Sequence, residues 1–156
     1  MTALEAGGRL CGLWFSDQKR IPVPRDEWRA APELPFFRSL QEQLDTYFQI
    51  GRCRFNLPLL LQGTPFQTAI WRLLQTVPGG DTVTYGDLAR MYAKHQVGML
   101  TSARAVGGAV GRNPVAIIVP CHRVIGAGGV LTGYAGGLSR KAVLLELEQR
   151  LGREPG

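Results

Sequence analysis

Two residues capable of covalent chemistry stand side by side in the segment 117–129, IIVPCHRVIGAGG. Cys121 follows an apolar run that is typical of a buried strand, and a glycine-rich turn comes after it. Its thiol could be an inert part of the core, a metal ligand or a nucleophile. The three cysteines and two histidines of the chain lack the spacing of a four-ligand site, so we expect no metal.

The neighbours of Cys121 favour a reactive thiol over an inert one. A free thiol has a pKa of about 8.5 and is only a few per cent ionised at neutral pH, so a nucleophile needs activation. His122 and Arg123 are basic and would favour the thiolate. Because neighbouring side chains of a strand point to opposite faces, we expect His122 to act on Cys121 through a bridging water unless the backbone bends sharply.

A histidine that moves protons is usually oriented by a carboxylate. Helical periodicity in the segment 138–151 places four leucines on one side, namely Leu144, Leu145, Leu147 and Leu151. Glu148 lies within this apolar arc, whereas Glu146 lies almost opposite. We therefore predict that Glu148 orients His122; the alternative is a boundary residue whose carboxylate reaches solvent.

The segment 101–113, TSARAVGGAVGRN, predicts a helix with one long outward side chain. Its inward side is predicted to hold Ala103, Val106, Ala109 and Val110, and its outward side Arg104, Gly107 and Gly108. Each glycine weakens a helix by about 1 kcal/mol relative to alanine, so the pair indicates close approach to a large surface. That surface is either a nucleic acid, as for the second helix of a helix-turn-helix, or simply a neighbouring helix.

The elements around these residues divide the chain into two parts. A strand is expected at 7–15, an amphipathic helix from Pro35 to Gly51, and an edge strand at 53–61 because Pro58 lacks a backbone donor. Two helices with capping boxes should follow, after Thr64 and after Thr84. We predict an α/β fold with a small amino-terminal α/β domain at 1–62 and a mostly helical domain at 63–156.

Composition narrows the class of partner. The net charge is +6, and residues 64–156 hold +5 of it, with 10 Lys+Arg against 5 Asp+Glu. This imbalance suits a polyanion such as nucleic acid, although solubility alone also produces basic surfaces. No apolar run approaches the roughly 20 residues of a membrane span. The number of cysteines is three, which is odd and favours a reducing, cytoplasmic setting over one with disulfides.

The segments ARAVGGAVGRNPVAIIVPCHRVIGAGG and TGYAGGLSRKAVLLELE together resemble the O6-alkylguanine-DNA alkyltransferases, also called methylated-DNA-protein-cysteine methyltransferases. The likeness extends over residues 7–150 and implies an amino-terminal domain that is ribonuclease-H-like, followed by a helix-turn-helix domain. It also implies repair of double-stranded DNA carrying O6-alkylguanine, bound through the minor groove. The damaged base is flipped out, and its alkyl group passes irreversibly to the protein in a single turnover without any cofactor.

The resemblance assigns roles to individual residues. Cys121 would accept the alkyl group, His122 would contact the thiol through water, Glu148 would orient His122, and Asn113 would support the turn. The residues implied in DNA binding are Tyr85, Gly86 and Arg104, with Tyr85 also assisting base rotation and Arg104 filling the vacated stack. The residues implied in selecting guanine are Val124, Tyr134 and Ala135.

The chain also departs from the family pattern. The first strand of the amino-terminal sheet is expected to be shortened or missing, and the segment MYAKHQVGMLTS makes a long link that contains His95. The family implies a monomer that could cluster on DNA. Two rival functions stay open, a non-catalytic lesion-binding relative and an alkylation-sensing regulator, but the former lacks the cysteine and the latter usually carries additional sequence.

Overall fold

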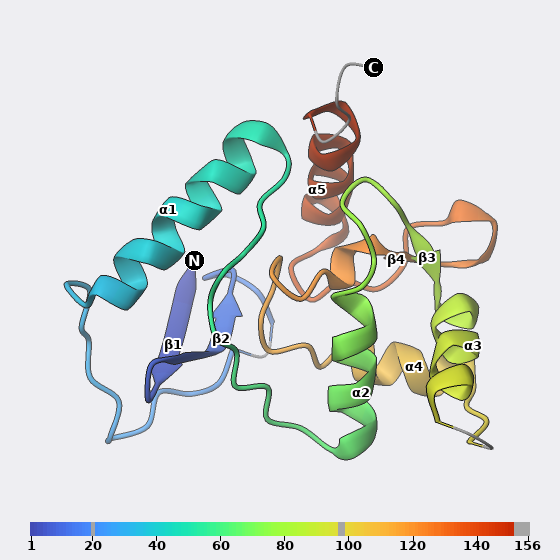
Figure 1. Cartoon of the computed structure of the whole chain (residues 1–156), viewed down its shortest axis with the longest axis horizontal. Helices are drawn as coiled ribbons and strands as arrows, with labels where there is room; N and C mark the ends of the chain where they lie inside the picture. The colour runs from blue at the N-terminus through green and yellow to red at the C-terminus, as the bar shows by residue number, and fades with distance from the viewer. Residues whose placement is uncertain (20, 97–98, 152–156) are drawn as a thin grey trace.

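The computed structural model describes residues 1–19, 21–96 and 99–151, with Leu151 described only in its backbone. A β-hairpin and one long helix form the amino-terminal part, and four further helices connected by irregular segments form the rest (Figure 1). The architecture is therefore mixed α/β, as the sequence predicts. No described helix has the length and apolar character needed to cross a membrane.

The amino-terminal hairpin pairs β1 (Thr2–Ala6) with β2 (Arg9–Trp14) in antiparallel register. Gly7 and Gly8 make the turn with φ of 59° and 75°, values that glycine adopts without strain. The expected strand at 7–15 is confirmed. The first strand, which the sequence predicts to be shortened or missing, is not missing, because β1 is present and pairs with β2.

Helix α1 (Pro35–Ile50) ends where the sequence predicts. Gly51 adopts the left-handed conformation with φ of 69°, and its N–H binds the carbonyl of Tyr47 at 2.8 Å. Leu40 and Tyr47 are buried on the inner face of the helix, whereas the apolar Phe48 is 44% exposed.

The edge strand expected at 53–61 does not form. Only Leu59 makes a bridge, in parallel with Leu10, through bonds from the Leu10 N–H to the Pro58 carbonyl and from the Leu60 N–H to the Leu10 carbonyl. Pro58 itself has no N–H to donate. The segment is thus an extended connection that crosses from α1 to α2 (Figure 1).

Three helices pack together in the second part: α2 (Pro65–Leu74), α3 (Tyr85–His95) and α4 (Ala103–Val110). The two predicted capping boxes are confirmed, with Thr64 paired to Gln67 and Thr84 paired to Asp87. The buried indole N–H of Trp71 donates to the Ala109 carbonyl at 2.9 Å. This bond fixes α4 against α2.

The orientation of α4 matches the prediction except at its first residue. Val106, Ala109 and Val110 are buried and Arg104 is exposed, but Ala103 is exposed because it lies in the first turn, outside the packed region. A Cβ on Gly107 would lie 3.6 Å from the ring of Tyr85. That is an ordinary van der Waals distance, so Gly107 faces Tyr85 of α3, but the packing of the two helices leaves room for a Cβ there.

The apolar run before Cys121 is not a strand. Val115 makes a single bridge to Leu13, and the chain then turns at Ile117, which has φ of 69°. Cys121–Arg123 form a 3-10 turn, so the backbone bends sharply at the cysteine. The next residues form β4 (Val124–Ile125), which pairs in parallel with β3 (Val83–Thr84).

The glycine-rich segment after β4 forms a turn, as the sequence indicates. Ala127–Gly129 form a short 3-10 helix, closed by a bond from the Gly126 N–H to the Val130 carbonyl at 2.8 Å. Because β4 pairs with β3, no antiparallel partner for it follows this turn. Helix α5 (Leu138–Leu151) then packs against α1 and against the 3-10 turn at Cys121.

Candidate active site

Cys121 is buried at the start of the 3-10 turn, with 7% of its surface exposed. The side-chain amide of Asn113 donates a hydrogen bond to Sγ at 3.0 Å. Pro120 ends the preceding segment and directs the thiol inward. The thiol is therefore held in one place.

Asn113 also holds the turn that leads to the cysteine. Its Nδ2 donates to the carbonyl of Val119 at 2.8 Å, and its Oδ1 accepts from the Val115 N–H at 3.0 Å. Side-chain bonds to backbone compete with a strand ladder, which explains why this apolar run turns. The supporting position predicted for Asn113 is found in the structure.

Burial raises the pKa of the Cys121 thiol, because a thiolate loses hydration inside the protein. The hydrogen bond from Asn113 and the charge of Lys141 oppose this rise. The sequence predicts that the positive charges of His122 and Arg123 favour the thiolate, but the side chains of both residues bind Glu148. The positive charge that lowers the pKa of the thiol is that of Lys141.

His122 and Glu148 form a fully buried pair. Nε2 of His122 lies 2.8 Å from Oε1 of Glu148, and both side chains have no exposed surface. This contact is the pairing that the apolar arc of the last helix predicts. A carboxylate has no proton to donate, so Nε2 carries the proton and Nδ1 is the free lone pair.

Five donor groups, from four residues, surround the two oxygens of Glu148. Oε1 accepts from Tyr47 and from Nη2 of Arg123, both at 2.8 Å, as well as from His122. Oε2 accepts from Nε of Arg123 at 2.9 Å and from the Gly80 N–H at 3.2 Å. Burial alone would raise the pKa of Glu148, but the bonds from His122 and Arg123 hold it well below its usual range. Glu148 is therefore an anion at neutral pH.

The His122 ring is neutral at neutral pH. Burial lowers its pKa below the ordinary 6.5, and the hydrogen bond that the ring donates to Glu148 offsets this only partly. Nδ1 is buried and has no hydrogen-bond partner among the described residues. A neutral ring with its proton on Nε2 presents at Nδ1 the atom that can accept a proton.

A small cavity of about 20 Å³ lies over the thiol. Four of the predicted site residues line this cavity: Asn113, Cys121, Tyr134 and Ala135. The Tyr134 hydroxyl is buried and has no hydrogen-bond partner in the described structure. The cavity has room for about one water molecule.

The other predicted residues lie outside this cavity. Tyr85 begins α3, and its hydroxyl donates to the Thr132 carbonyl at 3.4 Å, so it contacts the segment that leads to Tyr134. Val124 is buried in β4 next to the turn. Gly86 lies on α3, where a Cβ would be in ordinary contact with the side chains of Thr84 and Arg90, and Arg104 lies on the exposed face of α4.

Two buried polar residues were missed by sequence reasoning. Tyr47 reaches Glu148 from a helix 101 positions away, and nothing local indicates that contact. Lys141 is fully buried, with Nζ donating to the Thr132 carbonyl at 2.6 Å. A usable signal existed for Lys141, because it lies seven residues before Glu148 on the same apolar face.

This geometry defines a protein that presents one restrained, buried thiol next to a neutral histidine and an ionised glutamate. Among the described residues, no cluster of histidine, cysteine or acidic side chains could hold a metal ion. The arrangement can deprotonate the thiol locally and support nucleophilic attack by sulfur.

Comparisons with known proteins agree with this class. The family model described as 6-O-methylguanine DNA methyltransferase, DNA binding domain, matches residues 65–150. A methylated-DNA–protein-cysteine methyltransferase of Mycolicibacterium paratuberculosis is 48% identical over 141 residues, which is 90% of this chain and 81% of the relative. A protein of the same name from Methanosarcina acetivorans is 48% identical over 135 residues, covering 86% and 81%.

A solved structure extends the likeness to the whole fold. The crystal structure of Mycobacterium tuberculosis OGT in complex with DNA superimposes with a TM-score of 0.82 at 44% identity, covering 94% of this chain and 84% of that chain. The chain therefore belongs to the family of methylated-DNA–protein-cysteine methyltransferases.

Proposed function

We propose that this protein repairs DNA directly by moving an alkyl group from O6 of guanine to Sγ of Cys121. The observation that carries the proposal is the buried thiol held by Asn113 next to the His122–Glu148 pair. Sulfur attacks the sp³ carbon in line, so an S–C bond forms while the C–O6 bond breaks. The thioether product is stable, and each molecule of protein acts once.

His122 takes the proton of the thiol. Its Nδ1 is the unprotonated atom of a neutral ring, and one water molecule between Nδ1 and Sγ would carry the proton across. Glu148 stabilises the imidazolium that forms, because its carboxylate is ionised and bonded to Nε2. The departing guanine takes a proton in turn, and the phenol of Tyr85 is the donor we assign.

A flipped guanine must enter where the cavity of about 20 Å³ now lies. The cavity is far smaller than a purine, so the segment 131–137 must move when the base arrives. Gly133 and Gly137, with φ of 44° and 92°, give this segment its freedom. Once open, the site selects guanine through the carbonyl of Val124, the ring of Tyr134 and the N–H of Ala135.

The DNA lies across α3 and α4, which we take as the two helices of a helix-turn-helix in the minor groove. Tyr85 and Gly86 start α3, and Arg104 projects from the exposed face of α4. Arg104 fills the space that the flipped base leaves. The crystal structure of Mycobacterium tuberculosis OGT in complex with DNA supports DNA as the partner.

We retain the division at residues 62 and 63, with the amino-terminal part ribonuclease-H-like. Under this division, Tyr47 belongs to the first domain and its partner Glu148 to the second. The amino-terminal domain then has a defined task, which is to complete the hydrogen bonds of the buried carboxylate.

Intact-mass measurement tests the function. Incubation with a duplex that carries one O6-methylguanine should add one methyl group to the protein, and peptide mapping should place it on Cys121. Cys121→Ser should gain no mass, while Cys53→Ser, which alters a cysteine outside the site, should react like the wild type. An unmodified protein that still binds the lesion would instead indicate a non-catalytic binding function.

A further inference from the structure

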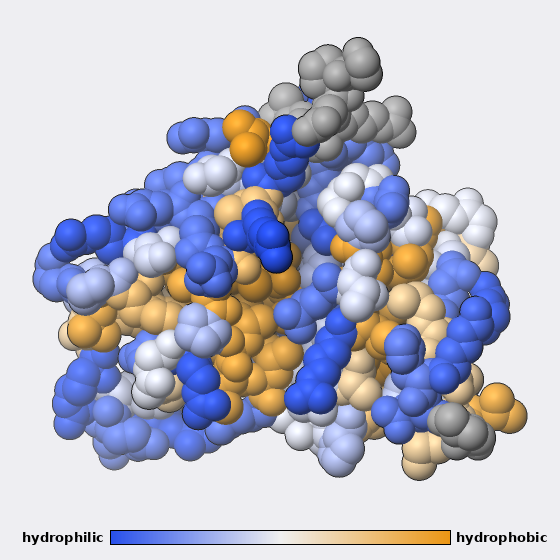
Figure 2. All heavy atoms as spheres, in the orientation of Figure 1, coloured by the Kyte–Doolittle hydropathy of each residue, from blue (hydrophilic) through white to orange (hydrophobic). Residues whose placement is uncertain are grey.

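A second, much larger hollow lies away from the thiol. It opens between the extended segment that follows α1 and helix α2, and it has a volume of about 760 Å³. Figure 2 shows it as an apolar depression bordered by hydrophilic residues. None of its lining residues also lines the cavity over Cys121.

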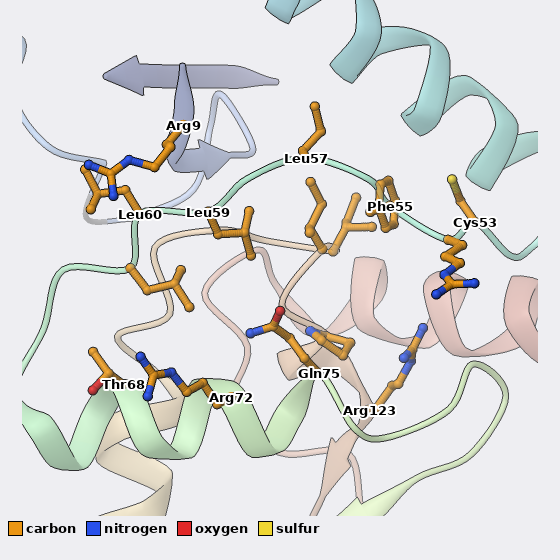
Figure 3. A pocket seen from close by; sticks show the side chains of 15 residues that line it. Arg9, Cys53, Phe55, Leu57, Leu59, Leu60, Thr68, Arg72, Gln75 and Arg123 are labelled. Atoms are coloured by element: carbon orange, nitrogen blue, oxygen red, sulfur yellow. The ribbon is translucent and has the colours of Figure 1, made fainter. Parts of the chain in front are cut away.

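The floor of this cleft is mainly aliphatic. Leu57, Leu59 and Leu61 of the extended segment line it together with Ile117 and Ile118 of the turn before the cysteine; Figure 3 shows Leu57 and Leu59 on this lining. All five are apolar, and four of them are only half-buried because no described part of the chain covers them from outside. The single aromatic ring on the lining is that of Phe55.

The rim of the cleft is cationic. Arg9, Arg54 and Arg72 border it, and all three are exposed. Among the residues that the structure describes, the guanidinium groups of Arg54 and Arg72 make no hydrogen bond or ion pair. No acidic residue of the described chain lines the cleft. Arg72 shares one face of α2 with two polar residues, Thr68 and Gln75.

One residue of the inner wall, Arg123, also contacts the active site and already has hydrogen-bond partners there. Arg123 lines the cleft, yet its guanidinium binds Glu148 and the Val77 carbonyl. The positive charge available to a ligand therefore comes from the arginines of the rim, and a ligand bound there leaves the Cys121 site intact.

We propose that this cleft is a docking site for an acidic peptide segment of another protein, with aliphatic side chains as anchors. Guanidinium groups bind carboxylates with two parallel hydrogen bonds, and unpaired arginines on the rim supply them. An aliphatic floor accepts leucine-like anchors. Single-stranded nucleic acid would require aromatic stacking platforms, and Phe55 alone does not provide a row of them.

Fluorescence anisotropy with labelled probes tests the proposal on the full-length protein. The probe is a peptide of roughly eight residues that alternates Asp and Leu, long enough to span the cleft when extended. We expect saturable binding that weakens with added salt. Arg72→Glu and Arg54→Glu should each weaken binding about tenfold or more, because each replaces an attractive charge by a repulsive one.

The matched control is Arg38→Glu, which makes the same charge change on the exposed side of α1, outside the cleft. Equal weakening in this variant would overturn the proposal, since net charge alone would then explain binding. A peptide that alternates Asp and Ser must bind much more weakly; equal binding would show that the apolar floor is not used.

Two further outcomes would also overturn the proposal. One is a lack of binding of the Asp–Leu peptide up to millimolar concentration. The other is tighter binding of an oligothymidylate of similar length that is lost in Arg72→Glu, which would make the cleft a nucleic-acid site. All variants should still be benzylated at Cys121 at the wild-type rate by free O6-benzylguanine, so this test is independent of the repair reaction.

Discussion

The phenol of Tyr47 donates a buried hydrogen bond of 2.8 Å to Oε1 of Glu148. The same hydroxyl lies 3.5 Å from Nε2 of His122, so one group from α1 contacts both members of the His122–Glu148 pair. The amino-terminal helix thereby completes the environment of a carboxylate on the last helix.

Tyr47→Phe should destabilise the protein by about 2 kcal/mol, because a hydrogen bond to a charged group is lost while the ring keeps its packing. Denaturant unfolding measures the change. The control is Tyr92→Phe, whose hydroxyl makes only a sulfur contact at 3.9 Å to Met99. Equal losses of unfolding free energy in the two variants would show that the hydrogen bond to Glu148 contributes no more to stability than the sulfur contact of Tyr92.

Glu148→Gln should cost about 3–5 kcal/mol of stability, because it leaves the Arg123 guanidinium without its buried counter-ion. Alkyl transfer should slow as well, since the imidazolium of His122 loses its stabilising charge. Glu146→Gln on the same helix is the control. Its ion pair with Arg150 is exposed, so the expected change is about 0.5 kcal/mol or less.

Part of this site was readable from the sequence, because an acidic residue within an apolar helical arc needs a partner. That argument gave Glu148 and, with the adjacent motif, His122. It would also have given Lys141, which lies on the same face. The contact with Tyr47 was not readable, since it depends on how two distant helices pack.

The strands were the least predictable part of the fold. Apolar runs at 53–61 and 115–119 have strand composition, but their backbone bonds go elsewhere. Asn113 takes the bonds of the second run, and Pro58 limits the first to one bridge. Helices with capping boxes depend on local bonds, so those elements were predicted correctly.

Stability should fall as the pH drops below 6.5. The pKa of His122 is lowered in the folded protein, so below pH 6.5 the unfolded chain binds a proton at this residue more readily than the folded protein does. The expected loss is about 1.4 kcal/mol per pH unit until the folded pKa is reached, and Glu148 adds a loss only below its ordinary value of 4.5.

Urea unfolding at pH 7.5, 6.5 and 5.5 measures this slope. His122→Asn should be less stable throughout but should lose the slope, whereas His95→Asn, at an exposed position, should retain it. Constant stability of the wild type across this range would contradict a buried neutral histidine.

The rate of alkyl transfer should rise with pH above neutrality. The pKa of Cys121 is raised by burial, so the thiolate fraction still increases between pH 7 and 8.5. Asn113→Ala should shift this profile to higher pH, because the amide hydrogen bond that lowers the pKa is lost. Free O6-benzylguanine is the suitable substrate, as it removes DNA binding from the measurement. An unshifted profile would reduce Asn113 to a purely structural role.

Arg104→Ala should slow the repair of duplex DNA by about tenfold or more, while the reaction with free O6-benzylguanine stays unchanged. Arg104 is exposed on α4 and lies outside the cavity over the thiol, so it has no route to influence the sulfur directly. In the function that we propose, Arg104 offsets the few kcal/mol needed to extrude a base. The control Arg38→Ala removes an exposed arginine from α1 and should leave both rates unchanged. Stopped-flow transfer measurements on the two substrates distinguish the cases, and equal losses on both would show that Arg104 acts on protein structure rather than on the base stack.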